Sequence, residues 1–392
     1  MNSGDLSACH YLTSQGHRIC WRKGVIAKVE PSGESGSGIW FAPPLLDLQV
    51  NGYGGIDFQS DSLTRADLQA AVGALKRDGC AQIFVTLVTD EWPKMLARLR
   101  RLKQLRSESL ELQYGIAGWH LEGPFMSPEP GYHGAHNPAL MLDPLPVHFQ
   151  TIREIAGSDG VLVTLSPERN GAIEAIRAAV ARGIAISLGH TNASAEVLKN
   201  AVRAGATSFT HLGNGCPQQL DRHDNIFWRA LETPGLTVGL IPDRIHVSPS
   251  LFRIFHRQLE RTRIWYTTDA VAPAGSPPGR YRFGGLEVDV GADQIVRQPG
   301  KSNFAGSALT PIQGVIRAAE MLGCSWRDVW DCFSTVPRHL MQLDSTMDAG
   351  GDANFCILET NPSGEIFKGT VYVRGEATSM CLTPPTAPVM TS

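Results

Sequence analysis

Residues 184–192, Ile-Ala-Ile-Ser-Leu-Gly-His-Thr-Asn, give the clearest indication of the fold of this chain. Its apolar first half is typical of a buried strand, and it ends in glycine and then histidine. A second strand-like run covers residues 207–211 and also ends in histidine, at His211. Since a helix is predicted between them over residues 195–204, the two runs are expected to be neighbouring parallel strands.

The same alternation of apolar strands and amphipathic helices extends in both directions from this pair. So many βα units predict either a (β/α)8 TIM-like barrel or a large doubly wound sheet, and we favour the barrel. The other predicted strands cover residues 39–50, 81–88, 114–120, 161–166, 236–241 and 264–268, and the other predicted helices cover residues 63–77, 92–105, 173–182, 249–259, 309–321 and 326–333.

Short strand-like pieces lie outside this repeat, near both ends of the chain and inside one loop. Those at residues 18–22 and 25–29 come before the repeat, and those at 354–358 and 370–373 come after it. We expect residues 1–43 plus 345–385 to form a small β-sandwich domain built from both termini, with residues 44–344 forming the barrel. Two alternating pieces within residues 273–302 predict a hairpin inserted in a βα loop.

Composition narrows the class of protein. The net charge of −3 gives no basic field that would attract nucleic acid. No charged segment followed by an apolar core opens the chain, and no run of about 18 apolar residues occurs, so we expect neither a signal peptide nor a membrane span. The eight cysteines form no CxxC pair and are expected to be reduced thiols of a cytoplasmic protein.

Four polar side chains follow predicted strands at the point where each strand ends. They are Glu122 in His-Leu-Glu-Gly-Pro-Phe, His190, His211, and Asp269 in Thr-Thr-Asp-Ala. Because parallel strands of a barrel bring their carboxyl ends to one face, these side chains are expected to converge. A glutamate and two histidines match a three-ligand catalytic metal site with one open position, and a nearby aspartate suits general base and acid catalysis.

Each of these residues also has a plainer interpretation when it is taken alone. Glu122 could be a loop residue in solvent, either histidine could be structural, and Asp269 could cap the next turn. Their joint occurrence on neighbouring strands favours the metal site. The sequence therefore predicts a metal-dependent hydrolase barrel.

Ordered motifs across residues 39–385 make the chain resemble the amidohydrolase superfamily and, within it, the N-acetylglucosamine-6-phosphate deacetylase family. The motifs are LDLQVNG at 46–52, HLEGPF at 120–125, GAHNP at 134–138, GHTNA at 189–193, THLGN at 210–214, DRIHV at 243–247, TDAVAPAG at 268–275 and GSALT at 306–310.

The resemblance implies roles for individual residues. Glu122, His190 and His211 match the family's metal ligands, Asp269 matches its catalytic acid and base, and His136 matches a histidine that contacts the substrate amide. Further positions match contacts to the sugar and its 6-phosphate; these are Ala135, Asn214, Gly215, Phe304 and Ala305 for the sugar, and Arg222 and His246 for the phosphate.

The resemblance also implies a homodimer in which Arg222 reaches the neighbouring subunit's site. The residues themselves leave another interpretation of Arg222 open, a surface ion pair with Asp221 or Asp224. A fork-like arginine contact suits phosphate, so we favour the phosphate role.

Two departures from the superfamily pattern affect the site. Gln49 and Asn51 stand where many amidohydrolases carry His-x-His, and amides are poor ligands for a transition metal. We therefore predict one divalent metal ion per subunit, with zinc favoured and Fe(II), cobalt or manganese open. After His211 the chain reads Gly213-Asn214-Gly215-Cys216 in place of a bulky residue and Asn-Ala-Met, which should reshape the sugar pocket.

The reaction implied by the resemblance is hydrolysis of the acetamide of N-acetylglucosamine 6-phosphate to glucosamine 6-phosphate and acetate. Asp269 would take a proton from water and then give it to the leaving amine, and His136 would help to stabilise the oxyanion. Two alternatives stay open at this stage. One is deacetylation of a different N-acetyl amino sugar or N-acyl compound, and the other is a binding homologue without activity.

Overall fold

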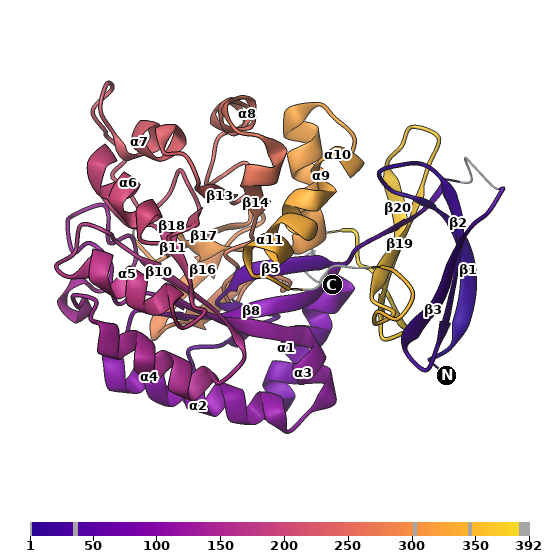
Figure 1. The fold of residues 1–392 in the computed structure, drawn as a ribbon, viewed down its shortest axis with the longest axis horizontal. Coiled ribbons are helices and arrows are strands. Elements are labelled where there is room, and N and C mark those ends of the chain that lie inside the picture. The colour runs from indigo at the N-terminus through magenta and orange to yellow at the C-terminus, as the bar shows by residue number, and fades with distance from the viewer. Residues whose placement is uncertain (1, 34–37, 301–303, 344–346, 384–392) are drawn as a thin grey trace, which may run out of the picture.

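The computed structural model describes residues 2–33, 38–300, 304–343 and 347–383. Eight parallel strands run in the order β14-β13-β12-β11-β10-β9-β8-β5 and curve into a barrel (Figure 1). The predicted (β/α)8 barrel is confirmed. The strands are β5 (Leu45–Val50), β8 (Cys80–Val88), β9 (Ile116–Glu122), β10 (Gly160–Leu165), β11 (Ala185–Leu188), β12 (Ser208–Phe209), β13 (Thr237–Leu240) and β14 (Ile264–Tyr266).

Amphipathic helices cover the outside of this barrel, and α1 shows why they form. Thr64 and Asp67 make a capping box at its start, and apolar residues at helical spacing, Leu68, Ala71 and Leu75, are buried. The main helices are α1 (Arg65–Arg77), α2 (Trp92–Ser107), α3 (Leu110–Gly115), α4 (Pro146–Ala156), α5 (Ala172–Val180), α6 (Ala195–Arg203), α7 (Ile226–Glu232), α8 (Pro249–Gln258), α9 (Pro311–Leu322), α10 (Arg327–Trp330) and α11 (Thr335–Leu340).

The predicted first strand over residues 39–50 is wrong in one respect, because it is two strands. β4 (Ile39–Ala42) pairs with β19 (Phe355–Thr360) in the terminal sheet, whereas β5 begins at Leu45 in the barrel. Pro43 and Pro44 separate them, and proline cannot donate a ladder hydrogen bond.

Strands from both ends of the chain form a second sheet of seven strands, in the order β21-β20-β19-β4-β1-β2-β3 (Figure 1, indigo and yellow). The ring of Trp21 on β2 lies 5.4 Å from that of Tyr372 on β20. In a flat sheet these strands would be roughly 19 Å apart at the usual spacing, so the sheet folds over as a sandwich. Its remaining strands are β1 (Gly4–His10), β2 (Gly16–Arg22), β3 (Val25–Pro31), β20 (Ile366–Val373) and β21 (Glu376–Ser379).

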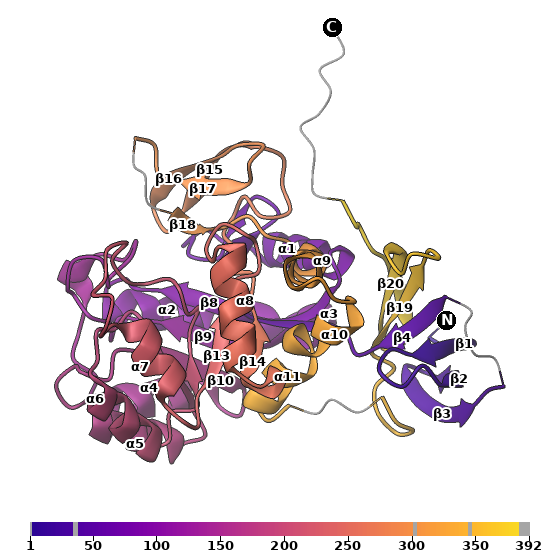
Figure 2. The same cartoon turned by 90° about the horizontal axis from the view of Figure 1, so that it is seen from above.

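The insertion after Asp269 is larger than the predicted hairpin. It forms a four-stranded sheet, β15-β16-β17-β18, which stands as a separate layer beside the barrel (Figure 2). The predicted pair corresponds to β15 (Gly279–Phe283) and β16 (Leu286–Val290), and the sheet adds β17 (Ile295–Arg297) and β18 (Phe304–Ser307).

The division at residues 1–43 plus 345–385 and 44–344 stays a prediction, and its boundary at 344/345 lies outside the described residues. Among the helices that the structure describes, none has the length and apolar character needed to cross a membrane.

Candidate active site

The four polar strand-end residues lie at the carboxyl ends of consecutive or nearby barrel strands. Glu122 is the last residue of β9, and His190 follows β11 by two residues. His211 follows β12 by two residues and Asp269 follows β14 by three. All four are buried or face a buried space, as expected for the catalytic face of such a barrel.

Glu122, His190 and His211 converge on a common point. The Nε2 atoms of His211 and His190 lie 3.0 and 3.6 Å from Oε1 of Glu122. The two histidine Nε2 atoms lie 3.2 Å from each other. Within the described ranges the Glu122 and His190 ligand atoms also group with His136, all within 4.8 Å of one another.

The chemistry of these atoms fits a cation. Nδ1 of His190 lies 2.8 Å from the carbonyl oxygen of Tyr132 and must donate to it, so Nε2 of the neutral ring presents a lone pair. That lone pair faces Nε2 of His211 and a carboxylate oxygen. Three electron-rich atoms this close require a shared proton or a metal ion, and the tautomer of His190 is the one a metal ligand needs.

The backbone at three of these residues is unusual. His190, His211 and Asp269 have φ angles of 51°, 29° and 50°, in the left-handed region that residues other than glycine rarely occupy. Such conformations persist where the surrounding structure imposes them, and they gather at functional sites. The strand ends are therefore shaped to bring these side chains inward.

Asp269 is held by two side-chain amides, those of Gln49 on β5 and of Asn51 immediately after it. Gln49 Nε2 donates to Asp269 Oδ1 at 3.0 Å and to Glu122 Oε1 at 2.7 Å, and Asn51 Nδ2 donates to Asp269 Oδ1 at 2.8 Å. Burial and the Glu122 carboxylate raise the pKa of Asp269 to about 7. A carboxyl whose pKa lies near neutrality can both take and give a proton under physiological conditions.

His136 also faces this cluster. Its Nε2 lies 3.9 Å from Glu122 Oε2, and its Nδ1 lies 3.0 Å from the Thr89 hydroxyl. Burial lowers the pKa of His136 to about 3, so the ring is neutral. The single Thr89 proton has two acceptors within reach, His136 Nδ1 at 3.0 Å and the Glu122 carbonyl oxygen at 3.4 Å. When Thr89 donates to the nearer one, Nδ1, the ring presents Nε2–H toward the site.

Thr89 is therefore expected to matter for activity although it lies outside the predicted set. Replacing Thr89 with valine keeps the shape of the side chain but removes the hydroxyl. The His136 ring would then no longer be held as a hydrogen-bond donor, and we expect kcat to fall about tenfold. Steady-state kinetics with bound metal quantified would check this. Thr89→Ser is the matched control, since it keeps the hydroxyl, and equal losses in both variants would contradict the hydrogen-bond explanation.

The predicted sugar-contacting residues surround this cluster from two loops and from β18. A Cβ atom placed on Gly215 would lie 2.9 Å from His190 Nδ1, so this loop packs directly on the ring. Asn214 Nδ2 donates a hydrogen bond to the carbonyl oxygen of His211 at 3.2 Å. Ala135 is exposed beside His136 on the opposite loop.

Phe304 and Ala305 reach the site through the inserted sheet. β18 joins the Asp269 turn by a hydrogen bond from Ser307 N to the Asp269 carbonyl oxygen, 3.0 Å long. Phe304 is partly exposed and its ring lies 5.0 Å from that of His246, whereas Ala305 is buried.

His246 lies close enough to Asp269 for their charges to interact. Its Nδ1 lies 2.6 Å from Asp243 Oδ2. Burial alone would lower the pKa of His246, but the Asp243 carboxylate outweighs this effect and raises it. A protonated histidine here would present a positive charge to an anionic substrate.

Arg222 is placed differently from the other predicted residues. It is exposed in the segment between β12 and α7, and its carbonyl oxygen accepts from Trp228 at 3.3 Å. Across the described part of the chain its guanidinium makes no hydrogen bond or ion pair, since Asp224 pairs with Arg229 and Asp221 accepts from backbone N–H groups. The surface ion pair with Asp221 or Asp224 is therefore not formed.

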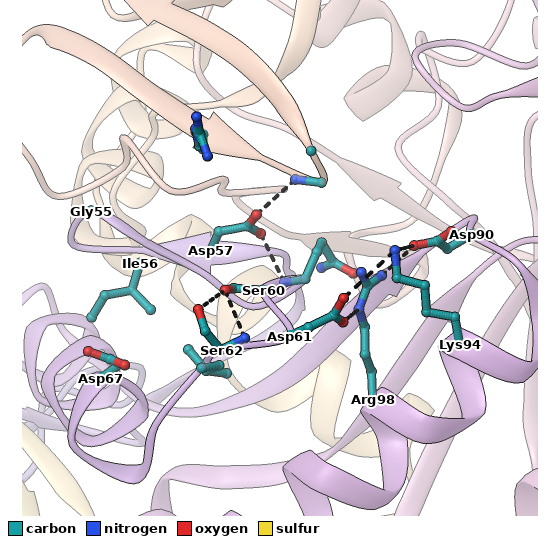
Figure 3. Close-up of a pocket in the computed structure, with 15 residues that line it drawn as sticks. Gly55, Ile56, Asp57, Ser60, Asp61, Ser62, Asp67, Asp90, Lys94 and Arg98 are labelled. Carbon is teal, nitrogen blue, oxygen red and sulfur yellow. Dashed lines mark hydrogen bonds and ion pairs between the residues drawn. The ribbon is translucent and has the colours of Figure 1, made fainter.

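A pocket of about 470 Å³ lies between the segment after β5, helix α2 and the inserted sheet (Figure 3). Its charges pair with one another: Arg98 contacts Asp61 at 2.8 Å and Asp90 at 2.7 Å. Asp57 accepts from Gly284 N at 2.9 Å and ties the inserted sheet to the barrel. None of the predicted site residues lines this pocket, and its ion pairs join α2 to the segments after β5 and β8.

Several residues that shape the site were not predicted from the sequence. Tyr132 and Asp243 orient His190 and His246, and Asp47 contacts the turn that carries Asp269. The Asp-x-x-His spacing of Asp243 and His246 is a signal that could have been used, whereas a backbone carbonyl such as that of Tyr132 leaves no trace in a sequence.

Several known proteins resemble this chain in sequence and in structure. A scan against protein-family models gives no match. N-acetylglucosamine-6-phosphate deacetylase of Danio rerio is 32% identical over 333 residues, which cover 81% of this chain and 80% of that protein. N-acetylgalactosamine-6-phosphate deacetylase of Escherichia coli is 28% identical over 349 residues, covering 87% and 90%.

Among solved structures, a mutant N-acetyl-D-glucosamine-6-phosphate deacetylase from Mycobacterium smegmatis in complex with N-acetyl-D-glucosamine-6-phosphate superposes with a TM-score of 0.83. It is 27% identical, and the match covers 96% of this chain and 99% of that one. With the barrel, the terminal β-sandwich and the strand-end cluster all in place, the chain belongs to the N-acetylglucosamine-6-phosphate deacetylase family of the amidohydrolase superfamily.

Proposed function

We propose that this protein hydrolyses the acetamide of N-acetylglucosamine 6-phosphate in a metal-dependent reaction, giving glucosamine 6-phosphate and acetate. The observation that carries the proposal is the convergence of Glu122, His190 and His211 beside Asp269 in a chain 32% identical to a deacetylase of that name. The Mycobacterium smegmatis relative was solved with that sugar phosphate.

Glu122, His190 and His211 would hold one divalent cation. When bound, such a cation polarises a carbonyl and lowers the pKa of water toward about 7. Gln49 Oε1 and Asn51 Oδ1 have no partner among the described residues, yet both side chains direct their NH2 groups at carboxylates. Because these amides act as hydrogen-bond donors rather than as metal ligands, they support one metal ion per subunit. Zinc is commonly bound by two histidines and a glutamate, so we favour zinc.

Asp269 is the proton carrier in this proposal. Its carboxylate takes a proton from the attacking water as the acetamide carbon becomes tetrahedral, and it then gives that proton to the leaving amine nitrogen. Gln49 and Asn51 hold the carboxylate through one oxygen, Oδ1, which leaves Oδ2 available for the transfer. The neutral ring of His136 is placed to donate a hydrogen bond to the carbonyl oxygen as negative charge develops there.

Recognition of the phosphate would come from His246 and Arg222. His246 lies at the site beside Phe304, while the Arg222 guanidinium is exposed and unpaired as far as the structure is described. An exposed arginine side chain that is not bound within its own subunit can extend across a dimer interface into the neighbouring site. The dimer, and the reach of Arg222 into the neighbouring subunit, are part of the proposal.

Arg222→Ala should separate phosphate binding from chemistry. We expect KM for the phosphorylated sugar to rise at least tenfold, because loss of one charge-assisted contact costs about 1.5–3 kcal/mol. The KM for unphosphorylated N-acetylglucosamine should stay within about twofold, since that sugar offers no phosphate. Arg261→Ala, which removes another exposed arginine, one paired with the acidic side chain of Asp328, is the control. An equal effect of Arg222→Ala on both sugars would exclude the phosphate role.

A second candidate substrate is N-acetylgalactosamine 6-phosphate, favoured by the relative with that activity in its name. Gly215 packs on the His190 ring and Gly213 on Val247, and neither adds side-chain volume there. The direct experiment is amine release from both sugar phosphates and from unphosphorylated N-acetylglucosamine. Preference for the glucosamine derivative supports the proposal, preference for its epimer selects the second candidate, and no turnover of any substrate would leave a binding homologue.

A further inference from the structure

The seam where the barrel closes, between β5 and β14, is joined in an unusual way. The eight strands pair in a continuous row from β14 to β5, so these two strands are its edges. Within the described ranges, the backbone bridge across this seam is Val50 with Ala270, supported by hydrogen bonds from Asn51 N and Gly52 N to the Ala270 carbonyl oxygen. Asp269, the proposed proton carrier, is the residue immediately before this bridge.

The carboxylate of Asp47 makes further hydrogen bonds across this seam. Asp47 lies on β5 and is fully buried. Its Oδ1 accepts from the Thr267 hydroxyl at 2.5 Å, and its Oδ2 accepts from the Thr268 hydroxyl at 2.5 Å and from Thr268 N at 3.0 Å. Oδ1 also accepts from Gln49 N at 3.1 Å. One side chain therefore binds β5 to the turn that follows β14.

These hydrogen bonds continue to the backbone of Asp269. A hydroxyl has a single proton, so Thr267 and Thr268, which donate to Asp47, can only accept at their other positions. Asp269 N donates to the Thr267 hydroxyl oxygen at 3.3 Å, and Ala270 N donates to that of Thr268 at 3.1 Å. The N–H groups on both sides of the Asp269 α-carbon are thereby fixed while its φ angle is 50°.

We propose that Asp47 is a positioning residue for the reaction, which holds the Asp269 carboxylate in its reactive place through Thr267 and Thr268. The inference rests on the proposed function only in naming Asp269 as the proton carrier. Asp47 is fully buried on β5, the strand that carries Gln49 and leads directly into Asn51. A displacement of about 1 Å in a reacting group can cost 10²-fold in rate, so a rigid support for Asp269 has a direct effect on turnover.

Asp47→Asn disturbs this support with little change in volume. Each Asp47 oxygen accepts one backbone N–H, from Gln49 or from Thr268, so either orientation of the new amide sets its NH2 group against an N–H donor. We expect kcat to fall about 10²-fold while KM and bound metal stay within about threefold, because the ligands and the sugar contacts lie on other strands. Thr268→Val should act in the same direction, and Thr268→Ser, which keeps the hydroxyl, should restore most of the rate.

The control for general destabilisation is Asp159→Asn. Asp159 is a mostly buried carboxylate at the opposite end of the barrel, bound to Trp119 Nε1 and Arg106, each at 2.9 Å. This variant should lower Tm and leave kcat unchanged. A fall in kcat matched by Asp159→Asn, or equal rates in Thr268→Val and Thr268→Ser, would reduce Asp47 to a structural residue.

A crystal structure of Asp47→Asn tests the inference without any substrate. The Asp269 carboxylate should leave the Gln49 and Asn51 amides or occupy more than one position. An unmoved Asp269 carboxylate would overturn the inference whatever the kinetics show. If the wild-type protein turned over none of the sugars while Asp269 moved in the variant, the proposed function would fail and the positioning role would stand.

Discussion

Asp269→Asn is expected to lower kcat by about 10³-fold, within the 10²–10⁴ range typical of a general acid–base residue. The asparagine keeps an oxygen that can accept from Gln49 and Asn51, so the side chain should stay in place. What it loses is the ability to carry a proton. The assay is amine release under saturating substrate, with metal content measured on the same sample.

The metal content is the control in this experiment, because Asp269 lies outside the Glu122, His190 and His211 set. We expect the variant to keep its metal and to keep KM within about threefold. Near-normal turnover of a metal-loaded Asp269→Asn protein would show that another group transfers the proton.

The pH dependence follows from the same carboxyl. Burial raises the pKa of Asp269 to about 7, and the charge of a bound cation opposes that shift. Since the reaction needs the ionised form as base, kcat/KM of the wild type should fall as pH drops through the pKa of Asp269, which a bound cation holds below about 7. The acid limb should disappear from the residual activity of Asp269→Asn.

Glu122→Gln should have an effect of similar size through loss of the metal. The substitution removes the only negative charge among the three proposed ligands and leaves the shape almost unchanged. Because a transition metal binds an amide far more weakly than a carboxylate, we expect bound metal to drop to a small fraction and turnover to fall at least about 10²-fold.

After chelation, added divalent metal should restore the turnover of the wild-type protein. The turnover of Glu122→Gln should return only at a high metal concentration. Glu129→Gln is the matched control, since Glu129 is exposed on the same side of the barrel and should change neither metal content nor rate. Full activity and full metal content in Glu122→Gln would mean that the metal is held elsewhere, for example by His136 and His190 with another ligand.

The barrel and its strand ends could be predicted from the sequence because both leave local signals. Apolar runs of strand length alternate with helices, and Glu122, His190 and His211 each follow such a run. The split between β4 and β5 was missed because Ile39–Val50 reads as one apolar stretch, although Pro43 and Pro44 mark the break. α4 and α7 were also missed, since their short amphipathic patterns compete with long polar loops around them.

What could not be predicted depends on contacts between strands far apart in the chain. A buried row of hydrogen bonds crosses the barrel below the site, from His120 to Thr164 at 2.8 Å and from Thr164 to Thr210 at 2.8 Å. Burial lowers the pKa of His120 to about 4, so this histidine is neutral and belongs to the core. In the sequence His120 and Glu122 stand in one motif, and the fold alone separates the core residue from the proposed ligand.

The Asp47 contacts are a second example. Asp47 and Thr268 are separated by more than two hundred residues, and only closure of the barrel brings them together. Arg222 is the opposite case, because its predicted role depends on a second subunit, and its own chain leaves the guanidinium exposed.

Glu122, His190 and His211 are proposed to hold the metal ion with which the enzyme hydrolyses an acetylated amino sugar phosphate. The most direct test is to titrate chelator-treated protein with zinc and to follow amine release from N-acetylglucosamine 6-phosphate at each step. We expect turnover to be absent at the start, to rise in proportion to added metal and to level off near one equivalent per chain. Full turnover by metal-depleted protein, or no turnover at any metal content, would contradict the claim.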